Sequence, residues 1–381
     1  MRRVAIIGVG CTVPRPVTPD VSYRELVYEA ALKAYQSAGI EPKDIDCFTA
    51  CSEDFNEGTS IFDEYVPDQL GAPLKPVHTV GGDGIHGLAA AFMQVATGLL
   101  DTAVVEAHSK ASNIITLHHI TELAIDPVFN RPLAVNPHYI AGLEMRRFLY
   151  ETGVTVEDCA AVAVKNKRNA LKTHNNVYGG EFTTEDVLNS DPISDPLTLL
   201  QVSQFSDVAV VIVLAAEERA KTLRGVPVWI KGLGWCADSP SLESRSWGSA
   251  AYAQLACSMA YKMAAVTNPA REIDLFEIDD TYAYKELQHL EAASLCARGE
   301  SGKLTRLGAT GKNGSLKVNL SGGSLGCGVM LEATGLFKVA QIVSQLRGIA
   351  GPAQVEDAKV GLALSWRGVP TASGAVAILG K

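Results

Sequence analysis

The segment VAIIGVG at residues 4–10 recurs as VWIKGLG at residues 228–234, and both copies read as buried strands that contain glycine. Further segments repeat in the same order. The pairs are ELVYEAALKAYQSAGI (25–40) with SAAYAQLACSMAYKMAAV (249–266), DIDCFTACSED (44–54) with EIDLFEIDDTY (272–282), GGDGIHG (81–87) with GGSLGCG (322–328), and TAVVEAHSK (102–110) with VGLALSWRG (360–368). This ordered repeat indicates that the chain contains two similar halves.

Each half reads as strand, helix, strand, glycine-rich turn, buried helix and strand. Such alternation is typical of α/β proteins with right-handed crossovers and mostly parallel sheets that are buried on both faces. We therefore expect an α/β fold in which residues 1–225 and 226–381 form similar layers about a pseudo-two-fold axis. Residues 111–200 have no counterpart in the second half and include two amphipathic helical patterns. We interpret them as an inserted loop domain that carries a binding surface.

Composition narrows the class of protein. The 381 residues carry a formal net charge of −9, which argues against nucleic acid as a partner, although an anionic small ligand can bind where basic groups gather. The eight cysteines form no CxxC pair and no Cys/His cluster, which predicts free thiols, no metal site and a reducing cytoplasm. No apolar run approaches the roughly 18 residues of a membrane span.

Two glycine-rich turns each lead toward an apolar helix. Glycine lets backbone N–H groups turn toward a ligand, and a helix N-terminus favours negative charge. The turns therefore predict an oxyanion-binding site, while tight packing between the two halves explains the same glycines equally well. The candidate turn residues are Gly84, Gly87, Gly322, Gly323 and Gly328.

Polar side chains accompany these turns. Asp83 and His86 lie in the first turn, and Asp279, Asp280 and Tyr282 follow the strand at 272–278. Histidine titrates near neutrality, and neighbouring carboxylates can take acid and base roles, so these residues are candidates for proton transfer. Helix capping is the alternative role for Asp83 and Asp280, and a packed ring is the alternative for His86.

A basic segment, KNKRNALK at residues 165–172, lies in the inserted region. Lys165, Lys167 and Arg168 gather there on one predicted helix. Such a group can hold the phosphates of a ligand, and a solvated helix face is the alternative interpretation.

Several of these motifs together resemble thiolases of the sterol-carrier-protein type. They are the repeat, the KNKRNA segment, TTEDVLNSDPISDPLTLL at 183–200 and NLSGGSLGCGVMLEATG at 319–335. The resemblance covers essentially the whole chain. It implies a layered α/β fold of two halves, an inserted loop domain that binds CoA, and a homodimer at minimum.

The resemblance also implies that the family's nucleophile is missing. The family opens its first buried helix with a Cys-x-Ser-Gly pattern. With the glycine of this pattern set on Gly87, the serine falls on His86 and the cysteine on Gly84. A slip of one residue gives Asp83 instead, and neither residue supplies a thiolate.

The other family motifs are altered as well. The His-Asp-Cys-Phe motif falls on residues 279–282, which removes its histidine and its cysteine. The Gly-His-Pro motif falls on residues 328–330, which removes the base that activates the nucleophile. Cys327 lies in that loop, two residues from the histidine position, and is a candidate cavity residue rather than a nucleophile. Acyl transfer through a covalent intermediate needs an activated nucleophile, so we do not expect ordinary thiolase activity.

Two functions remain open. The resemblance extends to cysteine-less, thiolase-like aldolases, which implies an acyl-CoA ligand, no covalently bound cofactor and a small partner with a zinc ribbon and an OB-like domain. It implies retro-aldol or Claisen-type chemistry with Asp279, His86 and Tyr282 as acid–base candidates. Those aldolases are thought to use tyrosines, and Trp366 stands where a tyrosine of the last strand is expected. The alternative is a non-catalytic scaffold subunit that partners an active paralogue.

Overall fold

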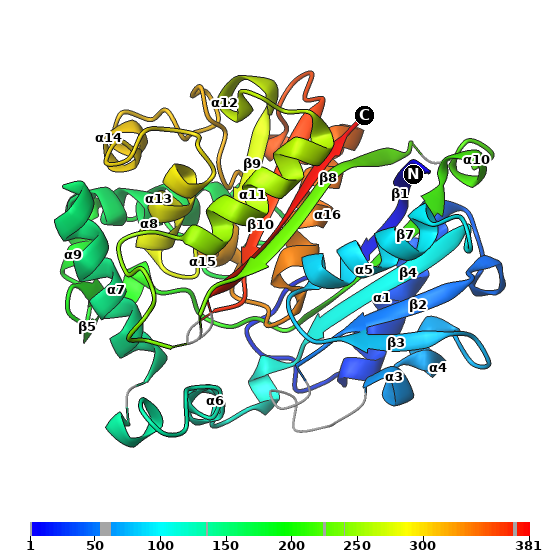
Figure 1. The fold of residues 1–381 in the computed structure, drawn as a ribbon, viewed down its shortest axis with the longest axis horizontal. Coiled ribbons are helices and arrows are strands. Elements are labelled where there is room, and N and C mark those ends of the chain that lie inside the picture. The colour runs from blue at the N-terminus through cyan, green and yellow to red at the C-terminus, as the bar shows by residue number, and fades with distance from the viewer. Residues whose placement is uncertain (1, 54–61, 135, 224–225, 240, 369–371) are drawn as a thin grey trace.

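A nine-stranded sheet runs through the molecule (Figure 1). The computed structural model describes residues 2–381 except 54–61, 135, 224–225, 240 and 369–371. The strands of this sheet are β1 (Val4–Cys11), β2 (Cys47–Cys51), β3 (Val77–Val80), β4 (Thr102–Ser109), β7 (Val208–Ala216), β8 (Val228–Ala237), β9 (Leu275–Ile278), β10 (Val360–Trp366) and β11 (Ser373–Gly380).

The two halves of the sheet are equivalent. The strand order is β3-β2-β4-β7-β1-β8-β11-β10-β9. β1 and β8, the two copies of the repeated segment, meet at the centre, where Ala5 pairs with Trp229. Outward from this ladder, β7, β4 and β2 are matched by β11, β10 and β9. The expected division after residue 225 falls beside residues 224–225, which lie outside the described residues.

The expectation of a mostly parallel sheet is wrong. Of the eight neighbouring pairs, three are parallel, namely β2–β3, β2–β4 and β9–β10, and five are antiparallel. Ser109 of β4 pairs with Val208 of β7, so the chain leaves and re-enters the sheet at the same end. Trp366 of β10 pairs with Gly374 of β11 in the same way. Each half therefore closes with an antiparallel pair of strands, joined in the first half by the insertion and in the second half by residues 367–372.

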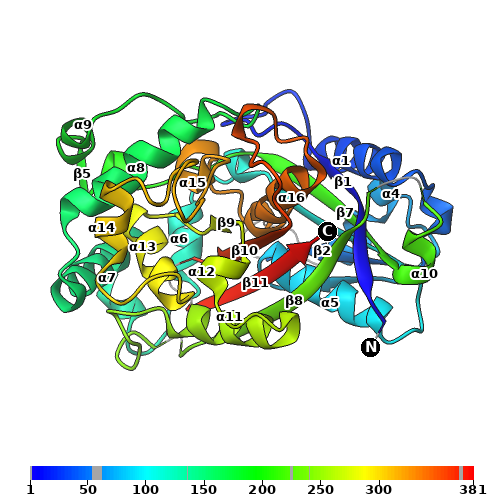
Figure 2. The same cartoon turned by 90° about the horizontal axis from the view of Figure 1, so that it is seen from above.

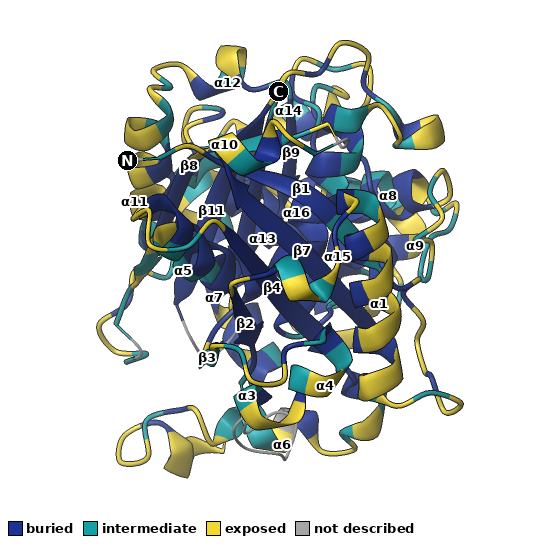
Figure 3. Ribbon diagram, turned by 90° about the vertical axis from the view of Figure 1, so that its right-hand side faces the viewer, coloured by how far each residue is buried: buried dark blue, intermediate teal, exposed yellow. Residues whose placement is uncertain are grey.

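Helices cover both faces of each half of the sheet, α1 and α5 in the first half and α11 and α16 in the second (Figure 2). Figure 3 shows the buried strands behind α1, whose outer face is exposed. In the first half the helices are α1 (Tyr23–Ala38), α3 (Phe62–Tyr65), α4 (Pro67–Leu70), α5 (Gly84–Ala96) and α10 (Glu217–Ala220). In the second half they are α11 (Ala251–Ala264), α12 (Pro269–Glu272), α13 (Ala283–Ala292), α14 (Ser301–Arg306), α15 (Gly323–Cys327) and α16 (Ala333–Arg347).

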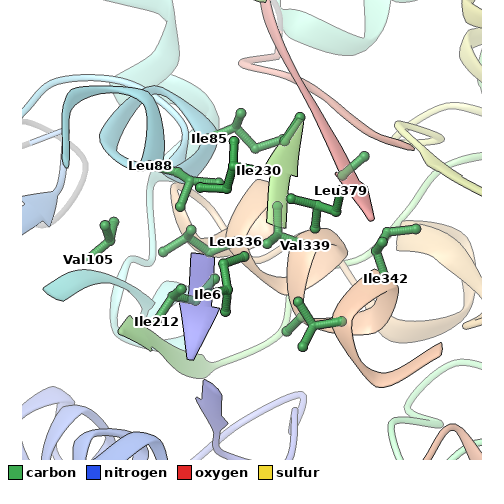
Figure 4. Close-up of a cluster of buried hydrophobic side chains, with 14 of the residues drawn as sticks. Ile6, Ile85, Leu88, Val105, Ile212, Ile230, Leu336, Val339, Ile342 and Leu379 are labelled. Carbon is green, nitrogen blue, oxygen red and sulfur yellow. The ribbon is translucent and has the colours of Figure 1, made fainter. Parts of the chain in front are cut away.

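The main core crosses the boundary between the halves. Ile85 and Leu88 of α5 belong to the same buried cluster as Leu336 and Val339 of α16, and Ile6 of β1 joins them (Figure 4). Each such side chain contributes about 1.5–3 kcal/mol when it is fully buried. This shared core holds the N-termini of α5 and α16 close together.

The repeated glycines serve close packing of helix on strand. A Cβ at Gly10 would lie 2.0 Å from the carbonyl oxygen of Ala30 in α1, and a Cβ at Gly234 would lie 2.0 Å from that of Ala256 in α11. No side chain fits at such a distance. The GxG of each repeated strand is therefore needed for the fold.

The insertion is a compact region at one end of the sheet, reached between β4 and β7 (Figure 1). Its two amphipathic helices are present as predicted. Thr155 and Asp158 form a capping box at the start of the second, and Asn136 caps the first. The elements are α6 (Leu117–Glu122), α7 (Pro137–Thr152), α8 (Val156–Ala170), α9 (Thr184–Leu188), β5 (Pro192–Ser194) and β6 (Leu197–Thr198). Within the described residues, we find no helix whose length and apolar character would let it cross a membrane.

Candidate active site

A cavity of about 210 Å³ lies where the insertion meets both halves of the chain. Its wall is mostly apolar and carries a few polar groups, a composition typical of small-molecule sites. The polar groups come from the loops that follow β2, β9 and β10, from the N-termini of α5 and α16, and from the insertion. They include Glu53, Asp83, His138, Tyr282, Glu332 and Arg367.

Asp83 lines the cavity, and its carboxylate joins the two halves. It caps α5, where Oδ1 accepts a hydrogen bond of 3.0 Å from the N–H of Ile85. Oδ1 also accepts from the Ser365 hydroxyl at 2.6 Å, and Oδ2 accepts from the N–H of Gly335 in α16 at 2.8 Å. Burial raises the pKa of this carboxyl above its ordinary value. The capping role considered for Asp83 is present, and the same group fixes α16 against α5.

Tyr282 and His138 form a hydrogen-bonded pair in the cavity wall. The Tyr282 hydroxyl lies 3.1 Å from Nδ1 of His138, which comes from the first turn of α7 in the insertion. Trp366 lines the same wall, and its ring centroid lies 6.2 Å from that of Tyr282. Burial raises the pKa of the Tyr282 phenol above its ordinary value, so the phenol is protonated at neutral pH. Tyr282 of the second half and His138 of the insertion, two side chains that can exchange protons, therefore lie beside each other in the cavity wall.

A buried ion pair supports the aromatic wall from behind. The ammonium of Lys285 lies 2.7 Å from Oε1 of Glu144 and 4.2 Å from the centre of the Trp366 ring. The Tyr284 hydroxyl donates to the same carboxylate at 2.8 Å. These contacts restrict the rotamers of Trp366 and of Tyr284, which stacks on Tyr282. The insertion, through Glu144, thus holds the cavity wall in place.

The neighbouring carboxylates Asp279 and Asp280 have different surroundings. Oδ1 of Asp280 accepts from the N–H of Ser324 at 2.6 Å, and Oδ2 accepts from Leu325 N–H at 3.1 Å and from the Asn166 amide at 2.8 Å. Asp280 therefore caps α15 and not α13, the helix that follows it in sequence. Oδ1 of Asp279 accepts from the N–H of Thr281 at 3.0 Å, and its Oδ2 has no hydrogen-bond partner among the described residues. Both side chains are fully buried, and neither lines the cavity.

The second glycine-rich turn uses its glycines and its backbone N–H groups for contacts within the fold. Its backbone N–H groups at residues 324 and 325 already bind Asp280, so they are not available to an oxyanion. A Cβ at Gly323 would lie 2.2 Å from the Asp280 carboxylate, and one at Gly328 would lie 2.1 Å from the Ser206 hydroxyl. Gly322, with φ of 108°, packs on Ala170. Among the described lining residues none of the three glycines appears, which favours the packing interpretation for this turn.

The first turn differs, because Gly82 and Asp83 line the cavity. Gly84 begins α5, and a Cβ there would lie 2.5 Å from Cγ of Leu336. A Cβ at Gly87 would meet the Cys51 sulfur at 2.0 Å. His86 is half-buried, with Nδ1 3.3 Å from the Asp83 carbonyl oxygen, and it lies outside the cavity wall. Gly84, one of the two expected nucleophile positions, therefore has no room for a side chain, and the other, Asp83, carries a carboxylate that lines the cavity.

Cys327 is not placed to react in this cavity. It is 1% exposed and donates to the Ser321 carbonyl oxygen at 3.3 Å. Burial raises the pKa of its thiol, and the charges of Glu277 and Asp280 add to this effect. No cysteine of the described chain lines the cavity. The expectation that Cys327 faces the cavity is therefore wrong, because its side chain packs behind the second turn.

The basic segment of α8 is folded inward. Lys165 binds Glu286 at 2.8 Å and the Val318 carbonyl oxygen at 3.1 Å, and buried Lys167 donates to the Leu325 carbonyl oxygen at 3.0 Å. Arg168 is half exposed and pairs with Glu181. Because the ammonium groups of Lys165 and Lys167 already bind protein oxygens, their placement argues against the phosphate-binding role that the sequence suggested.

The sequence pattern did not single out three cavity residues. His138 follows Asn136-Pro137, a helix-start signal that says nothing of a site. Glu332 follows the second turn, and its carbonyl oxygen accepts from the N–H of Gly84 at 2.8 Å, so it lies beside the expected nucleophile position. Arg367 pairs with Glu53 across the two halves. All three take their place from tertiary contacts.

Asp279 gives the fold a pH dependence. Burial raises its pKa to about 6, against about 3.9 for an ordinary aspartate, so between these values the folded state holds a proton that the unfolded state has lost. This carboxyl therefore favours folding less as the pH rises through that window. We expect Asp279→Asn to gain stability relative to the unsubstituted protein as the pH is raised from about 4 to about 7. Urea unfolding of both proteins across this range measures the difference, and a constant difference would contradict the assignment.

The fold and the site define a duplicated α/β protein whose cavity lies between two equivalent halves and an insertion. Residues 236–381 match the family described as thiolase C-terminal domain-like. The chain is 31% identical over 370 residues to acetyl-CoA acetyltransferase of Methanothermobacter thermautotrophicus, and the match covers 95% of each chain. The chain belongs to the thiolase family.

Two further comparisons refine this relationship. Benzoylsuccinyl-CoA thiolase subunit BbsB of Thauera aromatica is 28% identical over 370 residues, with 93% of this chain and 92% of that protein covered. Among solved structures, the Ltp2-ChsH2(DUF35) aldolase superposes with a TM-score of 0.84 and 26% identity, covering 99% of this chain and 97% of that chain. The proteins similar to this chain thus include one named as an acetyltransferase, one named as a thiolase subunit and one named as an aldolase.

Proposed function

We propose that this chain binds an acyl-CoA ester in the cavity and makes or breaks a carbon–carbon bond beside the thioester without a covalent acyl-enzyme. The observation that carries the proposal is the position of the expected nucleophile, Gly84, where a Cβ would lie 2.5 Å from Leu336. Acid–base groups, Tyr282 and His138, line the cavity instead. Relatives named for acyl-CoA reactions support the ligand class. A retro-aldol reaction fits this set of groups better than a thiolase-type Claisen reaction, which needs a thiolate.

Retro-aldol cleavage of a β-hydroxyacyl-CoA needs proton transfer and charge stabilisation only. A base removes the proton of the β-hydroxyl group, the Cα–Cβ bond breaks, and the oxygen becomes the carbonyl of the released aldehyde or ketone. The electron pair of the bond passes to the thioester as an enolate, which then takes up a proton at Cα. We assign Tyr282 to the β-hydroxyl group. The backbone of Gly82 and Asp83 at the N-terminus of α5 lies in the wall where the enolate oxygen needs donors.

We propose that the chain works as a homodimer with a small partner. One similar solved structure is named an Ltp2-ChsH2(DUF35) aldolase, and one relative is named as a thiolase subunit. Both names support a heteromeric assembly. The partner would be a DUF35-type protein with the zinc ribbon and OB-like domain that the resemblance to cysteine-less aldolases implies.

A second candidate function is a non-catalytic scaffold subunit. The side chains at several expected catalytic or ligand-binding positions are engaged by the protein itself. Asp83 caps α5, Asp280 caps α15, and Lys165 and Lys167 bind carbonyl oxygens. These contacts favour a structural role for those four residues.

Expression of the chain together with its genomic neighbours separates these functions. The purified complex is assayed with a β-hydroxyacyl-CoA in the presence and absence of free CoA, and with a β-ketoacyl-CoA. CoA-independent release of an aldehyde or ketone is the expected result. Binding of CoA esters without turnover in any combination would support the scaffold. CoA-dependent thiolysis by this chain alone would mean that the chain contains an activated nucleophile, and it would contradict the proposal.

A further inference from the structure

His138 is a cavity residue of the insertion that touches the proposed acid–base tyrosine. Its Nδ1 lies 3.1 Å from the Tyr282 hydroxyl, and the two rings meet edge to face at a centroid distance of 5.9 Å. Both residues line the same cavity. A tyrosine O–H can donate to Nδ1 when the imidazole carries its proton on Nε2.

Tyr282 by itself is a poor base. Burial raises the pKa of its phenol, and the charges of Glu144 and Asp279 raise the pKa further. A free phenolate in this wall is therefore disfavoured. The tyrosine can accept a proton from a substrate only when its own proton leaves in the same step, and Nδ1 of His138 lies within hydrogen-bond distance to accept it.

We propose that His138 accepts the Tyr282 proton while Tyr282 takes the proton of the substrate β-hydroxyl group, an inference that rests on the proposed retro-aldol function. The β-hydroxyl O–H bond breaks and a Tyr282 O–H bond forms, while the original Tyr282 proton moves to Nδ1. The oxygen electron pair forms the product carbonyl, and the Cα–Cβ pair passes to the enolate. The imidazolium then returns a proton through Tyr282 to Cα, so that no proton is gained or lost over the cycle.

The position of His138 in the chain suits an acceptor. It is the second residue of α7, after the cap Asn136 and the first-turn proline Pro137. Asp83 and Glu332 line the same cavity, and a carboxylate close to an imidazole favours its protonated form.

His138→Gln tests the relay, because glutamine keeps a polar group at the site but cannot carry the proton onward. We expect kcat for β-hydroxyacyl-CoA cleavage by the complex to fall by roughly 10²-fold or more, with KM changed only a few-fold. In His138→Ala, added imidazole should restore part of kcat. The double variant His138→Gln/Tyr282→Phe should be no slower than Tyr282→Phe, because the two groups act in one step. His119→Gln is the matched control, since His119 lies in the same insertion with a side chain 77% exposed.

The possible results of these experiments test the His138 relay separately from the proposed retro-aldol function. A wild-type complex that cleaves the substrate and a His138→Gln variant with unchanged kcat would overturn the relay and leave the proposed function standing. A raised KM with unchanged kcat would likewise overturn it, in favour of a substrate-binding role. A wild-type complex without cleavage of any β-hydroxyacyl-CoA would overturn both. Loss of kcat with imidazole rescue supports the relay, since a purely structural histidine would not be rescued.

Discussion

Tyr282→Phe is expected to lower kcat for β-hydroxyacyl-CoA cleavage by roughly 10²–10⁴-fold while the fold is retained. The substitution removes one hydroxyl group and keeps the ring. The ring contacts with Tyr284 and Trp366, with centroid distances of 6.0 and 6.2 Å, therefore remain. The hydroxyl is the group that contacts His138, another lining residue, and no other phenol is among the lining residues of the described chain. Steady-state kinetics of the purified complex measures the effect.

Tyr261→Phe is the matched control for this prediction. The Tyr261 hydroxyl donates to the Ala293 carbonyl oxygen at 2.7 Å, and neither residue lines the cavity. Its loss should cost about 1 kcal/mol of unfolding free energy and leave kcat unchanged. A Tyr282→Phe complex that turns over at the wild-type rate would remove Tyr282 from the mechanism. Attention would then move to Glu332, whose backbone binds Gly84 at the expected nucleophile position.

The repeated segments predicted most of the sheet, because their glycines are required by a local contact between a helix and a strand. Gly10 and Gly234 lie where a helix backbone approaches a strand too closely for any side chain, and the same letters appear in both halves. The direction of β7 and β11 was not predictable in this way. Their orientation follows from the end of the sheet at which the chain re-enters, as the pairs Ser109–Val208 and Trp366–Gly374 show. Strand and helix patterns carry no information on that choice.

The candidate site was predicted in part. Asp83 was correctly considered as a helix cap. An N-cap side chain binds the backbone N–H groups of the residues that directly follow it, so the sequence alone can indicate it. Asp280 caps a helix 44 residues further along the chain, a contact without a local signal. His138 reaches the cavity only because the insertion folds back onto both halves, so its sequence position gives no hint of chemistry. Lys165 and Lys167 show the converse, since a basic pattern typical of a solvated or phosphate-binding face is buried by tertiary contacts.

Asp280→Asn is expected to destabilise the fold by about 3–5 kcal/mol, the range for removal of one member of a buried ion pair. The Asp280 carboxylate is fully buried, and three N–H donors and the ammonium of Lys338 surround it. Lys338 is itself buried, and among the charges that raise the pKa of its ammonium group the negative charge of Asp280 has the largest effect. An amide in place of the carboxylate removes the largest of the negative charges that offset this ammonium, and Asp279 and Glu277 remain. Its NH₂ group would also face donors that need an acceptor. Equilibrium denaturation at neutral pH measures the loss.

Asp279→Asn is the matched control, because the two aspartates are neighbours in sequence and equally buried. Asp279 binds one backbone N–H, and burial raises its pKa to about 6, so its charged form is not stabilised by the fold at neutral pH. Asp279→Asn should therefore be neutral or stabilising under the same conditions. Equal losses in the two variants would mean that the second turn is not held by the Asp280 charge. In that case its geometry would rest on the glycine contacts with Ala170 and Ser206 alone. A large loss confined to Asp280→Asn would show that the Asp280 carboxylate, which lies in the expected catalytic motif, holds the second turn in place.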